Sequence, residues 1–578
     1  MYCVKVKYRS IFLTILLLFS FFYIKAQDYT LTPENLNSTN LNIIWGSQLN
    51  IQPGSTIYIP AGTYAAIRFY DLVGTEENPI TIINYGGQVT IDAPSYSAIS
   101  LQRCKYVRVT GSGDEQVPYG IKVQHTNAYS SGIYLENFTT DVEVDHIEIN
   151  DTGFAGIMAK TDPYCDNPDT WRSSGFIMKN IKIHDNYIHD TGGEGIYLGF
   201  TGGYKIDSNR SCNSIPIFAH WLEDITIANN FIERTGLDGI QVNLARKNCV
   251  IANNIVQNYA IKSQSFQDFA MSIGGGVYQV YNNRIYNTDH KGKGLQFISA
   301  DSGTKIYNNV VVTPNFHAFF IHQRHEFENH DEGVKVFNNT IIEPEYSGIF
   351  YNTTITSAVD AAKIGTQQDN VPSYFVNNLI YNPGSDYEGG NTWKQDAESY
   401  IDFNNKSTRN AMLPYTLTNV TTRDASILYF KEENSVDYYN INAVTSAVVD
   451  AGTNITSFGV STDILGTDRP NGYGYDVGAY EYIFSASDYQ KMKKIATIKN
   501  DENKLIVYPN PTTQNFAIKG NEVLGANVNI YSFSGQLLYN QPNYGGERID
   551  VSHYAGGNYF VNITSQTINK TTQLVVNR

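Results

Sequence analysis

Ionisable side chains recur at one position of the strand patterns in the middle of the chain, next to a glycine or its equivalent. The residues at this position are Ala155, Glu194, Asp238, Lys293, His317 and Ser347. Two neighbouring carboxylates, here Glu194 and Asp238, can act as acid and base, or as acid and nucleophile, in glycoside hydrolysis. The same pair could instead ligate calcium, which takes oxygen ligands. Strict alternation would point both side chains inward, but they stand at a bend, so their orientation is left open.

Two insertions, residues 161–174 and 201–223, carry aromatic and cationic side chains. We predict that four of these bind substrate, because flat rings stack on sugars and guanidinium groups pair with acids: Trp171, Tyr204, Arg210 and Trp221. The insertions follow equivalent strands, so they should lie side by side. Each contains one cysteine, Cys165 and Cys212, which we expect to form a disulfide. Cys104 and Cys249 lie within strand patterns and are expected to be buried thiols.

These residues are positioned by a repeat that runs from about residue 141 to residue 380. Each copy has a β-branched run, an Asn pair, an apolar pair, a polar turn and a glycine with alternating apolar residues, at a period of about 24 to 44 residues. The second Asn of each pair falls at a bend where it tolerates left-handed backbone and can bond the next coil: Asn186, Asn230, Asn254, Asn283, Asn309, Asn339 and Asn378. This column resembles the asparagine ladder of right-handed parallel β-helices, and a single-stranded solenoid of that kind is the predicted all-β fold.

Stacked coils place outward side chains at a fixed pitch, which suits a linear polymer. The outward positions read Met158, Tyr197, Gln241, Ser272, Gln296 and Phe320, followed two residues later by Lys160, Gly199, Asn243, Gly274, Ile298 and His322. Polar residues concentrate on the middle coils, where we expect a cleft. The predicted substrate-binding residues of this face are Tyr197, Gln241, Asn243 and Gln296.

The first coils, residues 54–64 and 78–82, resemble the opening of β-helical polysaccharide lyases, including alginate and chondroitin lyases. Such enzymes neutralise a uronate with calcium or Arg and remove its C5 proton with Lys, Arg or His. The resemblance implies that role for Lys293, Arg246, His322 and Arg324, since a cation near the carboxylate stabilises an enolate-like intermediate. It favours a lyase that cleaves by β-elimination, with calcium as a candidate cofactor.

The two ends of the chain carry targeting signals. A basic start and an apolar run from Ile11 to Ile24 predict a signal peptide, residues 1–26. The β-helix is expected over residues 27–484, with a closing segment near 449–482, and a polar linker over 485–504. Residues 505–578 begin with Val507-Tyr-Pro-Asn-Pro511 and resemble the type A sorting domain of type IX secretion, a small β-sandwich. That resemblance implies export by the type IX machinery, with release or attachment at the cell surface.

The net charge of the chain limits the kinds of partner that it can bind. The chain has 578 residues and a net charge of −15, so its long-range field repels nucleic acids and acidic membranes. No membrane span is expected in the mature protein, which we expect to be a monomer acting on an extracellular polysaccharide. Three functions stay open: a uronate lyase, which is preferred, a glycoside hydrolase that uses Glu194 and Asp238, and a non-catalytic glycan-binding or adhesive protein.

Overall fold

The computed structural model divides into two compact units, one ending at Tyr482 and one beginning at Ile483. It describes residues 27–201, 211–213, 215–287, 292–300, 302–323, 333–353, 372–384, 393–394, 401–404, 406–429, 438–441, 447–485, 488, 506–520, 523–532, 536–565 and 568–578. The predicted signal peptide lies outside these residues, as does nearly all of the predicted linker.

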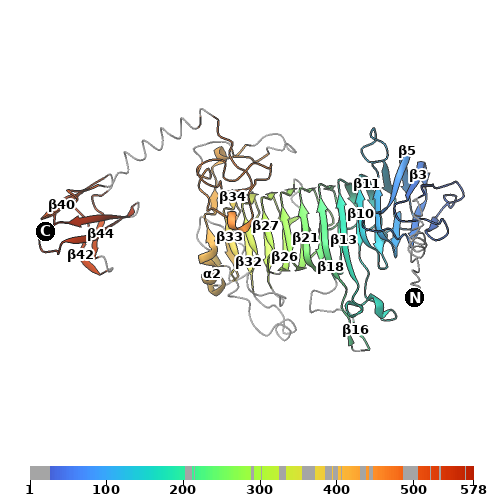
Figure 1. Cartoon of the computed structure of the whole chain (residues 1–578), viewed down its shortest axis with the longest axis horizontal. Helices are drawn as coiled ribbons and strands as arrows, with labels where there is room; N and C mark the ends of the chain where they lie inside the picture. The colour runs from blue at the N-terminus through green and yellow to red at the C-terminus, as the bar shows by residue number, and fades with distance from the viewer. Residues whose placement is uncertain are drawn as a thin grey trace, which may run out of the picture. The chain divides into compact units, whose positions relative to one another are not determined.

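The first unit is a right-handed parallel β-helix in which each coil adds one short strand to each of three faces, stacked as in Figure 1. The first face is a sheet of β2 (Leu41–Trp45), β4 (Ala66–Tyr70), β6 (Ile99–Gln102), β9 (Ile133–Glu136), β12 (Ile157–Ala159), β15 (Ile196–Leu198), β20 (Ile240–Asn243), β23 (Phe269–Gly276), β26 (Lys293–Ala300), β29 (Phe319–His322), β32 (Ile349–Asn352), β36 (Ile401–Phe403) and β35 (Trp393–Lys394). Only β35 runs antiparallel to its neighbour in this sheet.

The other two faces are joined through the long strands β3 and β5, each of which runs across both faces. The second face holds β1 (Tyr29–Thr30), β3 (Thr56–Tyr64), β5 (Ile80–Asp92), β7 (Lys105–Thr110), β10 (Thr140–Asp145), β13 (Ile177–His184), β18 (Trp221–Ala228), β21 (Ala245–Ala252), β24 (Tyr278–Tyr281), β27 (Lys305–Tyr307), β30 (Lys335–Phe337), β33 (Tyr374–Val376) and β37 (Thr416–Leu417). The third continues from β5 through β8 (Ile121–Gln124), β11 (Ile147–Thr152), β14 (Tyr187–Thr191), β19 (Phe231–Glu233), β22 (Ile255–Gln257), β25 (Arg284–Tyr286), β28 (Val310–Val312), β31 (Thr340–Ile342), β34 (Leu379–Tyr381) and β38 (Val420–Thr422).

Helical turns and one hairpin lie outside the three faces. They are η1 (Pro168–Thr170), η2 (Arg172–Ser174), the hairpin β16 (Ser211–Cys212) and β17 (Ile215–Pro216), α2 (Lys406–Met412), η3 (Leu413–Tyr415), η4 (Ala425–Ile427) and η5 (Thr456–Phe458). In the described part of the chain, no helix is long and apolar enough to cross a membrane.

The interior is filled by aliphatic side chains that stack from coil to coil. One such column, fully buried, runs through Ile57, Ile82, Val109, Val144, Ile183, Ile227, Ile251, Val280, Ile306, Val336 and Phe375. A single short strand cannot bury its inward face, so the core exists only when neighbouring coils stack. β-branched residues fit this pleated interior, which explains their excess at inward positions.

The asparagine ladder is present. Within each Asn pair, however, the ladder bond and the left-handed backbone belong to different residues, whereas the prediction assigned both to the second Asn. The second member forms the ladder: the Asn230 side chain donates to Asn254 Oδ1 at 3.0 Å and to the Ile183 carbonyl at 2.9 Å. The left-handed backbone belongs to the first member, as at Asn229 (φ 56°) and Asn253 (φ 57°). The prediction placed both properties on the second Asn. The two adjacent residues share the bend, because one turns the chain and the other pairs with the next coil.

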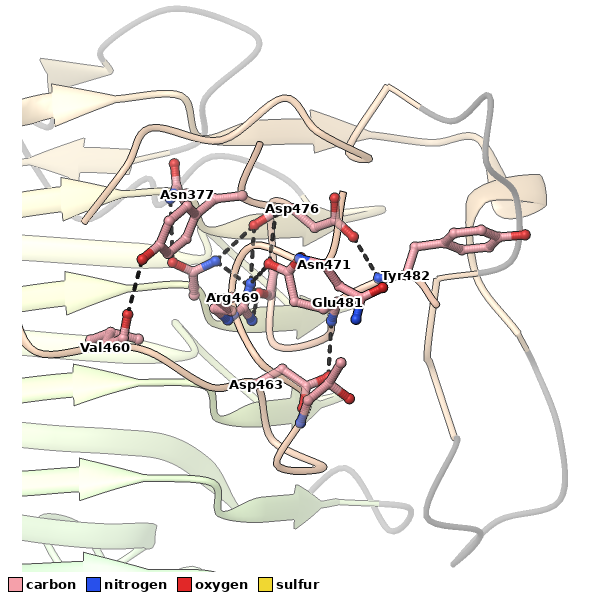
Figure 2. A network of polar contacts seen from close by, with 12 residues as sticks. Asn377, Val460, Asp463, Arg469, Asn471, Asp476, Glu481 and Tyr482 are labelled. Atoms are coloured by element: carbon pink, nitrogen blue, oxygen red, sulfur yellow. Dashed lines mark hydrogen bonds and ion pairs between the residues drawn. The ribbon is translucent and has the colours of Figure 1, made fainter. Parts of the chain in front are cut away.

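A closing segment, residues 447–482, packs against the later coils through buried polar contacts (Figure 2). Arg469, whose side chain is fully buried, donates to Glu481 Oε1 at 2.6 Å and to the Gly478 carbonyl at 2.8 Å. The same segment is also bound by the first residue of two Asn pairs. Asn308 donates to the Thr462 carbonyl and Asn338 to the Asp476 carbonyl, both at 2.8 Å. The segment therefore satisfies polar groups of the coils that it covers.

The second unit is antiparallel. It contains a three-stranded sheet of β39 (Ile506–Tyr508), β40 (Asn515–Lys519) and β43 (Ile549–Asp550), and a four-stranded sheet of β42 (Leu537–Gln541), β41 (Asn527–Ser532), β44 (Gly557–Thr564) and β45 (Asn569–Val576). One buried core, which includes Phe516, Val528 and Val561, joins the two sheets. This is the small β-sandwich that the sequence predicts.

Candidate functional site

A cleft of about 760 Å³ lies on the outer side of the first face, over β20, β23, β26 and β29. Its described lining is Thr201, Gln241, Val242, Asn243, Gln264, Ser265, Phe266, Gln267, Ser272, Ile273, Gly274, Gln296, Ile298, Phe320 and His322. Four residues predicted from the sequence meet here, namely Gln241, Asn243, Gln296 and His322. They come from three coils, so the stacking of strands alone brings them together.

The register of the strands sets two columns on the floor of the cleft. Gln241 pairs with Ser272, which pairs with Gln296, and the column ends at Phe320. The parallel column holds Asn243, Gly274, Ile298 and His322. The polar floor residues are between 2% and 9% exposed, so the cleft is deep enough to shield them from bulk water.

Hydrogen bonds order part of this floor. Ser272 Oγ donates to Gln296 Oε1 at 3.2 Å, and Asn243 Nδ2 donates to the Phe200 carbonyl at 2.9 Å. Gln241 Oε1 is buried and has no hydrogen-bond partner among the described residues. A buried acceptor without a partner costs free energy in the folded protein.

The rim of the cleft comes from a loop that the strand pattern does not reveal. Residues 264–267 line one side, and Phe266 is 81% exposed. Thr201 lines the cleft as well, and its hydroxyl bonds the Tyr197 hydroxyl at 2.7 Å. Tyr197, a predicted substrate-binding residue, is buried beside the cleft with Lys160 Nζ 4.7 Å from its ring centre. It therefore supports a lining residue and is not itself part of the described lining.

Aromatic rings close the cleft on the side of the later coils. Phe320 stacks on Phe350 with ring centres 5.4 Å apart, and Phe350 stacks on His317 at 4.8 Å. Burial lowers the pKa of His317 to about 3, so this imidazole is neutral at physiological pH. The exposed part of Phe320 gives the cleft one flat apolar wall, of the kind on which sugar rings stack.

Glu194 and Asp238 lie side by side on adjacent coils but do not face the cleft. Both are 0% exposed, so the open question of their orientation is resolved in favour of burial. Burial raises the pKa of Glu194 to about 7, and it raises the pKa of Asp238 well above its usual value, with the neighbouring Glu194 contributing. Such carboxyl groups hold protons more tightly than exposed ones. In this arrangement they cannot reach a polymer in the cleft as the acid and base of a hydrolase.

The same two carboxyl groups remain the predicted calcium ligands. Both oxygens of Glu194 and Oδ2 of Asp238 lack hydrogen-bond partners within the described residues, while Asp238 Oδ1 accepts from the Phe269 N–H at 2.7 Å. Unpaired buried carboxylate oxygens can be neutralised by bound protons or by a cation. Calcium at Glu194 and Asp238 stays a prediction.

Two predicted cationic residues, Lys293 and Arg246, lie outside the described lining and are paired with acids. Lys293 Nζ is 2.9 Å from Asp268 Oδ2, and Arg246 Nε is 2.6 Å from Glu223 Oε1. Lys293 begins β26, on the flank of the cleft. Arg246 begins β21, a strand of the second face. A substrate carboxylate would have to compete with an existing partner for either cation.

The two insertions lie together, as expected, at the side of the stack where Figure 1 labels β16. A disulfide joins Cys165 to Cys212, the expected pair, with Cα atoms 5.4 Å apart, and the backbone N–H of Arg172 donates to the Phe218 carbonyl. Cys104 and Cys249 are buried free thiols. The disulfide therefore ties one insertion to the other.

The two tryptophans of the insertions, Trp171 and Trp221, do not belong to the described lining of the cleft. Trp221 is buried, and the Arg172 guanidinium lies 3.7 Å from its ring centre, so this tryptophan supports the insertion instead of presenting a face to a sugar. Trp171 donates its indole N–H to the Tyr164 carbonyl at 2.7 Å. Tyr204, Arg210 and Arg324 lie outside the described residues.

One other group of described side chains has the composition of a metal site. Glu143, Asp145 and His184 bring their potential ligand atoms within 4.8 Å of one another on β10 and β13. The Arg108 guanidinium binds both oxygens of Asp145 at 2.8 Å and lies 3.1 Å from Glu143. The arginine already supplies the positive charge, so this group is an ion-pair network.

Sequence reasoning missed several lining residues. Ser272 and Gly274 were recognised as outward but not as part of the site, because small side chains carry no obvious chemistry. Gln264, Phe266 and Gln267 were missed because they belong to a loop that folds back over the floor. The sequence signal that could have identified this loop is an aromatic residue, Phe266, within the polar segment 263–268.

Comparisons with known proteins identify the second unit. Residues 506–577 match the family described as "Secretion system C-terminal sorting domain". This match indicates type IX export, with the protein secreted or attached to the cell surface. No protein with curated annotation matches the chain.

Several solved structures of low similarity match the first unit. The PL6 family alginate lyase AlyGC is 14% identical, with 79% of this chain and 59% of that chain covered and a TM-score of 0.36. The PL6 family polysaccharide lyase Pedsa3628 from Pseudopedobacter saltans is 14% identical, with 78% and 98% covered and a TM-score of 0.33. The GH136 lacto-N-biosidase from Eubacterium ramulus is 13% identical, with 61% and 66% covered and a TM-score of 0.31. This chain thus spans less than two thirds of the length of AlyGC.

The family match is confined to the second unit, which is a type IX secretion sorting domain.

Proposed function

We propose that this protein is an exported enzyme that degrades an extracellular polysaccharide in the cleft over β20, β23, β26 and β29. The observation that carries the proposal is the convergence of Gln241, Asn243, Gln296 and His322 in one cleft of about 760 Å³. Amides donate to and accept from sugar hydroxyls, and the Phe320 and Phe266 rings offer apolar faces for stacking. A histidine among them supplies a group that can transfer protons near neutral pH.

We propose further that cleavage is a β-elimination on a uronate-containing polymer. His322 would accept the proton at C5 of the uronate, the electron pair would form the C4–C5 double bond, and the C4–oxygen bond would break. The departing oxygen takes up a proton from solvent. The amide side chains would hold the ring so that C5 lies near the imidazole, since proton transfer requires hydrogen-bonding distance.

The lining favours this reaction over hydrolysis by a carboxylate pair. Among the described lining residues there is no Asp or Glu, and Glu194 and Asp238 are fully buried. A glycosidase of the usual type needs two carboxyl groups, one on each side of the bond that breaks. A histidine alone fits proton abstraction from an already acidic carbon better.

The test is an assay of the purified full chain against acidic and neutral polysaccharides, with and without a chelator. We expect ultraviolet absorbance from unsaturated sugar ends on a uronate polymer, and a loss of at least about 100-fold in His322→Ala, because general bases contribute rate factors of this size. His125→Ala, a histidine on the third face and outside the cleft, is the matched control and should retain activity.

The alternatives give different results. Reducing ends without ultraviolet absorbance would indicate a hydrolase and overturn the elimination. Retention of polymer with no cleavage would indicate a glycan-binding protein and overturn the enzymatic proposal. Full activity of His322→Ala would remove His322 from the mechanism.

A further inference from the structure

We propose that the Cys165–Cys212 disulfide controls polymer binding in the cleft, because the two insertions that it joins hold the cleft wall at Thr201 in place. The inference rests on the proposed function for its polymer, and it adds regulation of that site by the redox state of two cysteines. The first insertion (residues 161–174) supplies Arg172, the central positioning residue, and the second insertion (residues 201–223) begins with the wall.

The strand ladder of the first face does not fix this wall. Thr201 lies three residues beyond the end of β15 and belongs to the described lining of the cleft. Gly199 turns the chain between them with a left-handed backbone (φ 75°), and glycine can adopt other conformations at little cost. The bond between the Thr201 and Tyr197 hydroxyls, at 2.7 Å, is one restraint. The position of Thr201 therefore also depends on what its neighbour Phe200 packs against.

Phe200 packs against a small cluster that includes part of the second insertion. Trp221 and Leu244 belong to this buried cluster, and Phe200 is partly buried against it. The Phe200 carbonyl also accepts a hydrogen bond from Asn243 Nδ2 at 2.9 Å. Leu244 follows Asn243 with a left-handed backbone (φ 65°), a conformation that leucine keeps only where its surroundings hold it. The cluster therefore ties the wall to the end of β20, a strand of the cleft floor.

Arg172 connects the first insertion to this cluster. Its backbone N–H donates to the Phe218 carbonyl and its Nε donates to the Ala219 carbonyl, both at 2.8 Å. Its guanidinium lies 3.7 Å from the ring centre of Trp221, where a planar cation stacks well. One side chain of the first insertion thus restrains both the backbone and an aromatic ring of the second.

The disulfide closes the same arrangement on its outer side. Cys165 belongs to the first insertion, and Cys212 belongs to the hairpin of β16 and β17 that leads to residues 218–221. Without the covalent link, contacts such as those of Arg172 must hold two long insertions together against their conformational entropy. Reduction should therefore loosen the cluster under Phe200 and, with it, the wall at Thr201.

The disulfide and the dithiol are two interconvertible states of this support. The disulfide forms when the two thiols pass two electrons and two protons to a partner disulfide, which becomes a dithiol, and a soluble dithiol reverses the exchange. Cys165 is exposed, so a soluble thiol can reach it. Because the cytoplasm keeps cysteines reduced, the cleft would reach its binding shape only after export into oxidising surroundings.

The first experiment measures hydrogen exchange of the full chain with and without dithiothreitol. On reduction we expect at least about threefold faster exchange in peptides that cover residues 197–201 and 240–245, and no change in peptides from β26 and β29, because only the former contact the second insertion. Cys104 and Cys249 are free thiols, so Cys165–Cys212 is the one disulfide that the reductant meets in the described part of the chain. Unchanged exchange in both wall peptides would overturn the inference.

The matched control for the reductant is the double variant Cys165→Ser with Cys212→Ser. It should show the faster exchange from the start and should not respond to dithiothreitol. A response of this variant equal to that of the wild type would also overturn the inference, since the reductant would then act elsewhere. The double variant leaves Arg172 in place, so it keeps the test decisive if an arginine variant does not fold.

The second experiment measures binding and cleavage of alginate and polygalacturonate, two soluble uronate polymers. Reduced wild type and Arg172→Met should show KM raised at least about fivefold with kcat within about twofold, because a wall that is out of place weakens binding without touching the reacting group. His322 lies on β29, four strands from β15 and roughly 19 Å away. Arg172→Lys keeps the charge and should recover part of the loss.

The control for the arginine variant is Arg103→Met. This exposed arginine also lies near an aromatic ring, 5.2 Å from the centre of Tyr70, but on the early coils outside the cleft, so its loss should leave KM unchanged. A fall in kcat at unchanged KM in Arg172→Met would indicate general destabilisation and overturn the positioning role. If the oxidised chain neither binds nor cuts any polymer, the proposed function fails, whereas the exchange measurement still decides whether the disulfide controls the wall.

Discussion

At the scale of single residues, the buried carboxyl pair shows how far burial changes chemistry. Glu194 and Asp238 occupy adjacent coils with no described hydrogen-bond partner for three of their four oxygens. The pKa of Glu194 is raised to about 7 because burial disfavours the charged form. A group whose pKa rises on folding supports the folded state while it is protonated and opposes it once it ionises.

This gives a prediction for stability against pH. Unfolded Glu194 ionises near its ordinary pKa of 4.5, whereas folded Glu194 holds its proton up to about pH 7. Stability should therefore fall as the pH rises from about 5 to 8, by roughly 3 kcal/mol at full ionisation. Glu194→Gln cannot ionise, so its melting temperature should exceed that of the wild type at pH 8 and approach it at pH 5. The measurement is the melting temperature of both proteins across this range, and a constant difference would contradict the assignment.

At the scale of elements, the ladder makes each coil depend on its neighbours. Asn283 donates from its side chain to the Ile251 carbonyl and to Asn309 Oδ1, and its own Oδ1 accepts from the backbone N–H of Asn254. Removing this side chain takes a hydrogen-bond partner from two buried backbone groups of the preceding coil, the Ile251 carbonyl and the Asn254 N–H. Each orphaned group costs about 1–3 kcal/mol.

Asn283→Ala should accordingly lower the melting temperature by several degrees. The matched control is Asn282→Gly, because Asn282 supplies the left-handed turn (φ 55°), which glycine adopts without strain. That variant should melt within about a degree or two of the wild type. Equal losses in the two variants would show that the ladder and the turn do not have the separate roles assigned to them. Differential scanning calorimetry of the full chain makes the comparison.

The elements also show which parts of the site could be predicted. Outward positions such as Gln241, Gln296 and His322 were predictable because a period of two along each strand fixes the face on which a side chain lies. Lys293, Arg246 and Trp221 were not, because long side chains at strand ends and in insertions bind whatever partner lies within reach. Loop residues such as Phe266 follow no period at all. Glu194 sits at a bend, where alternation fails, so its burial follows from the packing of the folded coils and not from the sequence pattern.

At the scale of the whole molecule, the first unit is closed at its late coils by residues 447–482. The fully buried Arg469 joins Glu481 to backbone carbonyls of the same segment, as Figure 2 shows. Breaking a buried ion pair by removing one partner is strongly destabilising, because the other charge stays buried. The segment covers the coils of Asn308 and Asn338, so its loss would expose their polar bends to water.

Arg469→Met should therefore detach the closing segment before the coils unfold. We expect faster cleavage within residues 447–482 in limited proteolysis and a melting temperature lower by several degrees. Glu481→Gln in the same background should recover part of the loss, since it removes the unpaired charge. Arg103→Met is the control, because its ion pair with Asp71 is about 40% exposed and such pairs contribute about 0–1 kcal/mol. An unchanged cleavage pattern in Arg469→Met would exclude this role for the arginine.

In each Asn pair the second residue bonds the next coil, while some first residues bind the closing segment. This separation affects how such a protein can change in length during evolution. The second asparagines repeat one bond from coil to coil, so Asn186 could donate to Asn254 in place of Asn230 if one repeat, the 24 residues 230–253, were deleted. The contacts of the closing segment would be unchanged by this deletion, because the first asparagines that bind it, such as Asn308 and Asn338, lie further along the chain. Duplication or deletion of a coil can thus lengthen or shorten the binding face while both ends of the stack are inherited intact.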